Sequence, residues 1–233
     1  MKKLKGALGR KEKKMRTFRH ILRNIILILL VIVLLAFIIS FALSFIGTSR
    51  YVVKHGDLIN KVAAEEKIDN HLLAAIVRTE SDFKENVVAN DGGMGLTQLM
   101  PETAKEKADE LGIEYSREKI MDPETNLRIG SHYISQLMQK YQNLDLAIAA
   151  YNVGPSKVDK WLKDGVITWE RESMENIPAP ITRAYVKKVN KAKDIYSVIY
   201  PDKLPDSTAN MGRLKRSWDN LRHVFTWAVR QVK

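Results

Sequence analysis

The sequence predicts a mainly α-helical protein, with one transmembrane helix followed by a helical globular domain. Residues 25–46 form a continuous apolar run without a charged residue. Between residues 57 and 201, apolar residues recur at helical intervals, and no alternation of period two lasts long enough for a sheet. The expected divisions are a basic tail (1–24), a transmembrane helix (25–46), a tether (47–56), the globular domain (57–201), a linker (202–212) and a basic amphipathic helix (213–233).

The apolar run is long enough to serve as a membrane anchor. A helix of its 22 residues spans the hydrocarbon core of a bilayer, which is about 30 Å thick. Residues 1–24 hold ten Lys or Arg and one acid, so we expect this tail to stay in the cytoplasm and the rest to lie outside. The alternative is a cleaved signal peptide, for which Ala42-Leu43-Ser44 is an acceptable site. Because the run is longer than a signal core, we expect a retained anchor.

Capping residues mark the expected helix boundaries in the external part. Asp57 is the expected N-cap of a helix from Leu58 to Ile68. Asp69 or Asn70 can cap the next helix, which ends near Glu80. Later helix starts are marked by first-turn prolines at Pro101, Pro123 and Pro155, and Gly112, Gly154 and Pro201 mark ends. Pro178-Ala179-Pro180 is expected to form a rigid extended link before the helix that carries Ile181 to Ile199.

The charge distribution argues against nucleic-acid binding. The net charge is +11, but residues 51–208 hold 21 Lys or Arg and 25 acids. The positive charge is therefore concentrated at the two ends of the chain. A nucleic-acid-binding domain is expected to be basic on its own binding face, so we expect no such partner.

Several catalytic classes have no matching residues. There is no cysteine, so the fold contains no disulfide. The five histidines are scattered and form no zinc-binding motif, and no Gly-x-Ser-x-Gly elbow or phosphate-binding glycine loop is found. We therefore expect neither a metal nor a cofactor, which leaves carboxylate chemistry.

Glu80 is the candidate catalytic carboxylate. It ends an apolar helix that includes Leu72 to Val77, and a glycine-rich loop follows within 15 residues. Burial beside apolar neighbours raises the pKa of a carboxyl group, as a general acid requires. Alone, the feature is equally typical of a solvated surface charge at a helix end.

Four sequence blocks in order strengthen the assignment. They are Glu80-Ser81-Asp82-Phe83, the run GGMGLTQLMP at 92–101, the run AAYNVGP at 149–155, and Ile177-Pro178 followed by TRAYV at 182–186. In order and spacing these blocks resemble the soluble lytic transglycosylase family, a branch of the lysozyme-like superfamily that includes goose-type lysozymes. The resemblance covers roughly residues 55–200 and implies a lysozyme-like fold that cleaves the glycan strands of peptidoglycan.

The resemblance also implies residue roles. Glu80 matches the single catalytic acid, which protonates the oxygen between N-acetylmuramic acid and N-acetylglucosamine. It then takes a proton from the six-hydroxyl of the sugar, which closes an anhydro ring without a second carboxylate. The implied substrate-binding residues are Met94, Gly95, Leu96 and Gln98 from the loop, Tyr151 and Asn152 from the cleft floor, and Tyr185 near the acid.

Three positions depart from the family pattern. Thr97 stands where methionine is common, Ile181 where many members have glutamate, and Ala89 where many have a serine. Asp91 follows two residues after Ala89 and is a possible second carboxylate that activates water. The enzyme would then be a hydrolytic muramidase; alternatively, Asp91 is a plain turn residue.

The C-terminal segment and the biological setting allow several interpretations. Residues 213–233 carry apolar residues near helical spacing with arginines between them, a pattern typical of a helix that lies on a membrane or docks on a partner or on the domain. A non-catalytic peptidoglycan-binding scaffold is the rival from another functional class. Division or secretion machinery is a possible partner, and the tethered layout without cysteines fits a Gram-positive cell.

Overall fold

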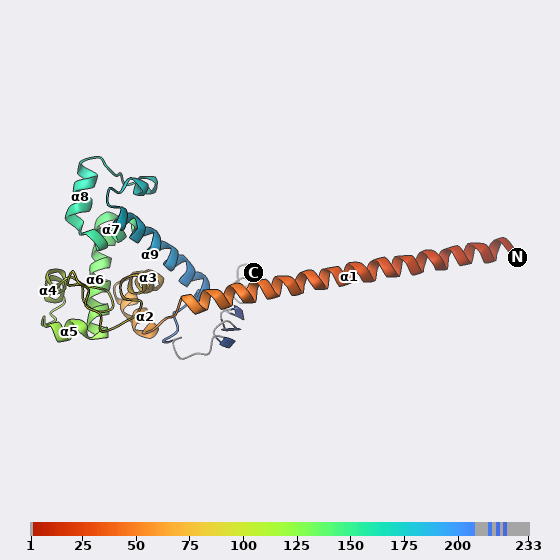
Figure 1. The fold of residues 1–233 in the computed structure, drawn as a ribbon, viewed down its shortest axis with the longest axis horizontal. Coiled ribbons are helices and arrows are strands. Elements are labelled where there is room, and N and C mark those ends of the chain that lie inside the picture. Colours follow the sequence, from red (N-terminus) through yellow and green to blue (C-terminus); the bar gives the residue numbers. More distant parts are fainter. Residues whose placement is uncertain (1, 208–213, 216–217, 220, 223–233) are drawn as a thin grey trace.

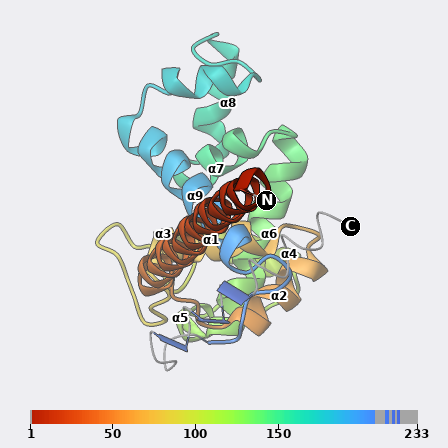
Figure 2. The same cartoon turned by 90° about the vertical axis from the view of Figure 1, so that its right-hand side faces the viewer.

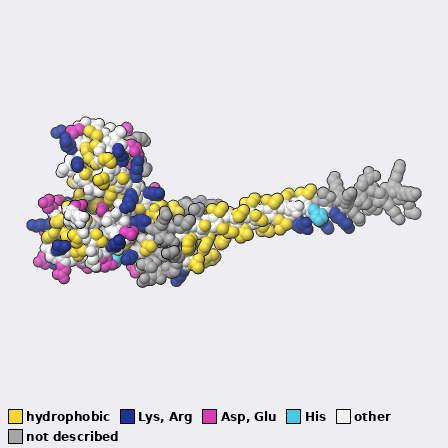
Figure 3. All heavy atoms as spheres, viewed as in Figure 1, with side chains coloured by type: hydrophobic (Ala, Val, Ile, Leu, Met, Phe, Trp, Pro, Cys, Tyr) yellow, Lys and Arg dark blue, Asp and Glu magenta, His cyan; other side chains and the backbone are white. Residues whose placement is uncertain are grey.

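The computed structural model describes residues 2–207, 214–215, 218–219 and 221–222. Helix α1 (Lys2–Arg50) extends away from the domain as one long helix (Figure 1). Within it, Phe18–Ala42 is long and apolar enough to cross a membrane. Figure 3 shows hydrophobic side chains along its exposed middle stretch and Lys and Arg side chains beyond it toward the N-terminus. The predicted span at 25–46 therefore overlaps most of this stretch.

The remaining helices form the globular domain. In order they are α2 (Gly56–Glu65), α3 (Asn70–Ser81), α4 (Pro101–Glu110), α5 (Arg117–Met121), α6 (Pro123–Tyr141), α7 (Leu144–Val153), α8 (Pro155–Lys163), the 3-10 helix η1 (Arg171–Asn176) and α9 (Pro180–Ile199). The described residues include no β-strand, only isolated bridges that join Met94 to Val88 and to Leu99. The prediction of a mainly α-helical domain is confirmed.

Most of the predicted helix starts are confirmed, with two corrections. The side chain of Asp69 accepts a hydrogen bond from the His71 amide at the start of α3, and the predicted prolines occupy the first turns of α4, α6 and α8. Pro180 was expected in an extended link, but it is the first residue of α9. The prediction that Asp57 caps α2 was wrong, because the helix already begins at Gly56 and Asp57 lies in its first turn. The cap position is His55, which has a φ of 57°.

Helix α3 lies at the centre of the main hydrophobic core. Its residues 71–77 are all buried, and it packs against α9 and α2. The core continues through α6 and α7, which pack against each other, and Figures 1 and 2 place α8 and α5 at opposite ends of the domain. A second, smaller cluster joins the loop at 94–99 to α4, α5 and α6. The catalytic candidate therefore sits at the end of the most buried helix.

The segment between the anchor and the domain differs from the expected tether. Residues 47–50 belong to α1, and residues 51–56 pack on the domain, where Val53 is fully buried. Part of the expected linker packs as well, because Leu204 is buried and its carbonyl accepts a hydrogen bond from the Asn60 side chain. Of the predicted helix 213–233, six residues are described and all are helical; the rest lies outside the described residues.

Candidate active site

Glu80 is held in the last turn of α3 by a tyrosine from α9. The Tyr185 hydroxyl donates a hydrogen bond of 2.6 Å to Glu80 Oε1. Glu80 is partly buried, whereas Tyr185 and the α3 residues 71–77 are buried. Because both helices pack along the core, the carboxyl group has a fixed position rather than the freedom of a surface glutamate.

The surroundings of Glu80 raise its pKa to about 7. The largest cause is burial, which disfavours the charged carboxylate. The Tyr185 hydrogen bond and the charge of Lys188 oppose this shift, and the charge of Asp91 adds to it. Glu80 is therefore protonated in a large fraction of molecules near neutral pH, as a general acid must be.

A second tyrosine lies near the acid. The Tyr151 hydroxyl donates to the carbonyl of Thr97 at 2.9 Å, and the Tyr151 ring lies 5.2 Å from the ring of Tyr133. Burial raises the pKa of Tyr151 and of Tyr185 well above the usual value, and the charge of Glu80 adds to both shifts. Both tyrosines therefore keep their protons and remain hydrogen-bond donors at the site.

The loop at 92–99 is attached directly to the end of α3. Ser81 Oγ lies 2.8 Å from the Leu96 carbonyl oxygen and 3.0 Å from that of Val77. The side-chain amide of Gln98 donates to the carbonyls of Val87 and Gly95, at 3.1 and 2.8 Å. The Ser81 hydroxyl therefore joins the end of α3 to the loop beside Glu80.

Asn126 supports this loop from α6, and the sequence analysis missed it. Its side chain is fully buried, and its Oδ1 accepts from the amide and hydroxyl of Thr97 at 2.8 and 2.7 Å. Its Nδ2 donates to the carbonyls of Met94 and Ile120. A Cβ added at Gly95, whose φ is +73°, would lie 2.4 Å from Asn126 Nδ2, so this position requires glycine. A polar residue on the apolar face of α6 was the available signal.

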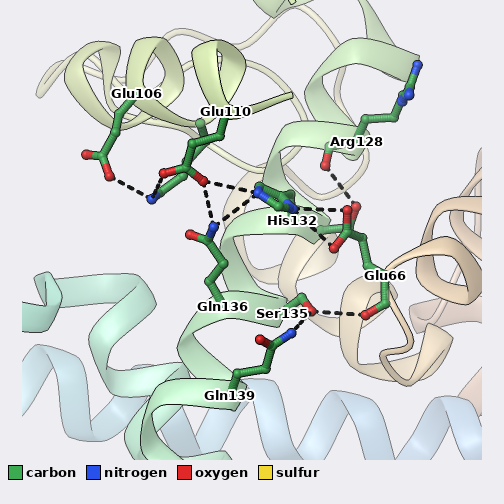
Figure 4. A network of polar contacts seen from close by, with 10 residues as sticks. Glu66, Glu106, Glu110, Arg128, His132, Ser135, Gln136 and Gln139 are labelled. Carbon is green, nitrogen blue, oxygen red and sulfur yellow. Dashed lines mark hydrogen bonds and ion pairs between the residues drawn. The ribbon is translucent and has the colours of Figure 1, made fainter. Parts of the chain in front are cut away.

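A polar network connects α4 and α6 to Glu66, the residue that follows α2 (Figure 4). His132 on α6 lies between Glu66, after α2, and Glu110 on α4, at 3.1 Å from each carboxylate. Lys107 donates to Glu110 at 2.7 Å, and its Nζ lies 6.0 Å from the Tyr133 ring centroid. The network fixes the helix that supplies Tyr133, the neighbour of the second site tyrosine.

The other candidate residues occupy different environments. The side chains of Met94 and Leu96 are buried in the two core clusters, so this part of the loop presents its backbone to the site. Asn152 is exposed at the end of α7. Asp91 is exposed and accepts a hydrogen bond of 3.3 Å from the Gly93 amide, as in a turn. Ile181 is 81% exposed, one helical turn before Tyr185.

No metal-binding cluster was found among the residues that the structure describes, where no three His, Asp or Glu side chains are arranged to hold an ion. The groups around Glu80 are Tyr185, Tyr151, Lys188 and Asp91, together with the loop at 92–99 that Ser81 holds beside it.

Comparison with known proteins finds similarity to lytic transglycosylases. Residues 57–167 match the family described as Transglycosylase SLT domain. The chain is 33% identical over 158 residues to the soluble lytic murein transglycosylase of Escherichia coli, and the match covers 66% of this chain and 24% of that protein. It is 30% identical over 166 residues to the membrane-bound lytic murein transglycosylase C of Yersinia pestis, and the match covers 61% of this chain and 46% of that protein. The chain thus spans about a quarter of the length of the first relative.

Solved structures show the same similarity. The crystal structure of the 70-kDa soluble lytic transglycosylase from Escherichia coli aligns with a TM-score of 0.63 and 31% identity, covering 70% of this chain and 27% of that one. An inactive mutant of the lytic transglycosylase Slt from Pseudomonas aeruginosa aligns with a TM-score of 0.58 and 33% identity, and the alignment covers 66% of this chain and 26% of that one.

Proposed function

Because residues 57–167 match the Transglycosylase SLT domain family, we propose that this chain cleaves peptidoglycan glycan strands as a lytic transglycosylase. The bond cleaved joins N-acetylmuramic acid to N-acetylglucosamine, and the product carries an anhydro ring. The observation that supports this most is the environment of Glu80, a partly buried carboxyl group with a pKa of about 7 on a fixed helix end.

In the proposed mechanism, Glu80 acts first as acid and then as base. Its proton passes to the bridging oxygen, the bond from that oxygen to the muramic acid C1 breaks, and N-acetylglucosamine leaves with a new hydroxyl group. The Glu80 carboxylate then accepts the proton of the muramic acid six-hydroxyl, whose oxygen bonds to C1. Glu80 ends protonated, and no water is consumed.

The neighbouring groups suit both protonation states of Glu80. The Tyr185 hydroxyl stabilises the carboxylate that forms after the first proton transfer, and the positive charge of Lys188 acts in the same direction. Gln98, the backbone at 94–96, Tyr151 and Asn152 are the proposed contacts to the sugar. Tyr185 belongs to this set through its contact with the acid.

Hydrolytic muramidase activity is the alternative reaction. It would require a second carboxylate that activates water, and Asp91 is the candidate. Its charge contributes to the pKa of Glu80, which places it within electrostatic reach of the acid. Its exposed position and its hydrogen bond to the Gly93 amide instead support a turn role, so the transglycosylase is favoured.

A non-catalytic scaffold is less favoured. A binding domain gains nothing from a partly buried carboxyl group with a raised pKa, because that arrangement costs folding stability. The Tyr185 hydrogen bond of 2.6 Å fixes the position of this carboxyl group, which also supports a role in chemistry.

We also propose the location of the enzyme. The stretch Phe18–Ala42 anchors the chain, residues 1–17 remain in the cytoplasm, and the domain faces the cell wall, which suits a Gram-positive cell. The membrane-bound relative supports the membrane attachment. Residues 213–233 are proposed to lie on the membrane, and division or secretion machinery is a candidate partner. Local opening of the wall for such machinery is compatible with a single small domain.

The proposed activity is tested with the full-length chain in detergent on purified glycan strands. We expect wild type to release products with anhydro ends and Glu80→Gln to release none. The matched control Glu102→Gln changes an exposed glutamate on α4 and is expected to remain active. Full activity of Glu80→Gln, or no glycan cleavage by the folded wild type, would refute the proposal.

A further inference from the structure

The segment 51–56, which joins the anchor helix to the first residue of α2, packs on the domain. Val53 is fully buried, and the carbonyl of Val52 accepts a hydrogen bond of 3.1 Å from the hydroxyl of Tyr196 on α9. The amide of Gly56 donates to the carbonyl of Asp206 at 2.8 Å. A flexible tether would make none of these contacts, so residues 51–56 have a fixed place against α9 and the segment that follows it.

This segment contacts the last turn of the helix that carries the acid. The guanidinium carbon of Arg78 lies 4.1 Å from the centroid of the Tyr51 ring, a cation–π contact. The Tyr51 ring also packs edge-on against Tyr196 at 5.6 Å. Arg78 is two residues before Glu80, and its carbonyl accepts the amide of Asp82, which ends the helix.

The same segment contacts the chain beyond α3. His55 Nε2 lies 2.9 Å from Glu85 Oε1. Two residues after Glu85, the carbonyl of Val87 accepts the Gly95 amide at 2.9 Å and the Gln98 side chain at 3.1 Å. The segment 51–56 is therefore connected both to the end of α3 and to the loop that faces the acid.

We propose that residues 51–56 form a juxtamembrane clamp that positions Glu80 for catalysis. Arg78 and Glu80 are two positions apart on a helix, so their side chains point in directions about 200° apart. Tyr51 therefore acts on the acid through Arg78 and the backbone of α3, as a positioning residue without contact to substrate. The inference rests on the proposed role of Glu80.

The clamp has a consequence for how the enzyme is used. Helix α1 ends at Arg50, one residue before Tyr51, so the membrane anchor is joined to the site without a flexible spacer. Cleavage of the chain near Ala42 would remove the apolar stretch but leave residues 51–56, the clamp, attached to the domain. Any change that pulls residues 51–56 from the domain would disturb the acid through Arg78 and the backbone of α3.

The test compares Tyr51→Ala with Tyr51→Phe in the full-length chain, using soluble uncrosslinked glycan strands. Tyr51→Ala is expected to lower kcat at least roughly tenfold, because small misplacements of a catalytic group are costly, with KM nearly unchanged. Tyr51→Phe keeps the ring under Arg78 and is expected to restore kcat. Tyr115→Ala removes an equally large, partly buried ring from the second core cluster and serves as the matched control.

The pH profile provides a readout that general destabilisation does not move. Tyr185 and Lys188 face Glu80 from α9, Tyr151 from α7 and Asp91 from the loop, and Tyr51→Ala changes none of them. Looser packing at the end of α3 exposes the acid and lowers its pKa, so the descending limb of the profile moves to lower pH. The control is expected to keep the wild-type profile.

The outcomes separate this inference from the proposed function. Wild-type kcat and an unchanged profile in folded Tyr51→Ala would overturn the clamp while Glu80→Gln stays inactive. If Tyr51→Ala does not fold, Arg78→Lys is tested in its place. This variant keeps the positive charge but loses the planar contact with the Tyr51 ring, and it is expected to lower kcat. Wild-type kcat in Arg78→Lys would overturn the clamp. Activity in Glu80→Gln would instead refute the proposed function.

Discussion

Replacement of Glu80 by glutamine is predicted to stabilise the fold while it abolishes activity. Glu80 has a pKa of about 7 in the folded protein, against an ordinary value of 4.5. Because burial favours the protonated form, the folded state loses stability when this carboxyl group ionises. Glutamine keeps the size and polarity of the protonated acid but never acquires the charge.

The magnitude follows from the shift in pKa. The pKa of Glu80 is raised from 4.5 in the unfolded chain to about 7 in the folded protein. The stability that the protonated Glu80 contributes is therefore fully present below pH 4.5 and is lost as the pH rises through about 7. At about 1.4 kcal/mol per pKa unit, the loss at alkaline pH is about 3 kcal/mol. In a domain of this size that corresponds to a rise in Tm of roughly 6–12 °C for the variant.

The assay is thermal unfolding of both proteins between pH 4 and pH 8.5. We expect equal Tm values below pH 4.5 and a Tm advantage of Glu80→Gln that grows between pH 4.5 and 7. Glu102→Gln, which changes an exposed glutamate, is the control and should show no such growth. A Tm advantage that is absent at pH 8, or equally large at pH 4, would refute the idea that a buried, ionising Glu80 is the cause.

Three further predictions concern the neighbours of the acid. Tyr185→Phe removes the 2.6 Å hydrogen bond that stabilises the Glu80 carboxylate, so the pKa of Glu80 rises above about 7. The descending limb of the pH–rate profile then moves to higher pH and kcat falls. A limb that stays in place would count against this contact. Asn126→Ala leaves buried partners unsatisfied and should lower stability by about 2–4 kcal/mol in denaturant unfolding, whereas a loss below about 1 kcal/mol would contradict its supporting role. Asp91→Asn should keep the anhydro products and most of the rate, and loss of all cleavage would favour the muramidase.

Local chemistry made much of the helical framework predictable. Asp69 and the first-turn prolines act within a few residues of the chain, so their effect can be read from the sequence. The position of Glu80 at the end of an apolar helix was predictable for the same reason. Its protonation state also depends on Tyr185, which is 105 positions away in the sequence, and only the family resemblance brought these two residues together.

The parts that were missed depend on long-range contacts. Asn126 reads as one more polar residue on a helix, and its four hydrogen bonds appear only when α6 packs against the 92–99 loop. Tyr51 lies in a short polar stretch that resembles a tether, and its role depends on Arg78 and Tyr196. The place of Asn126 on the apolar face of α6 was a signal of a buried polar group, but neither spacing nor capping preference could identify the partners of Asn126 or of Tyr51.

The central claim is that Glu80 closes an anhydro ring on the sugar without adding water to the cleaved bond. The most direct measurement is the mass of the new glycan ends after digestion by the full-length chain in water enriched in oxygen-18. The account predicts ends that are one water lighter than reducing ends and carry no heavy oxygen, and no new ends with Glu80→Gln. New reducing ends that carry heavy oxygen would contradict it and identify a hydrolase.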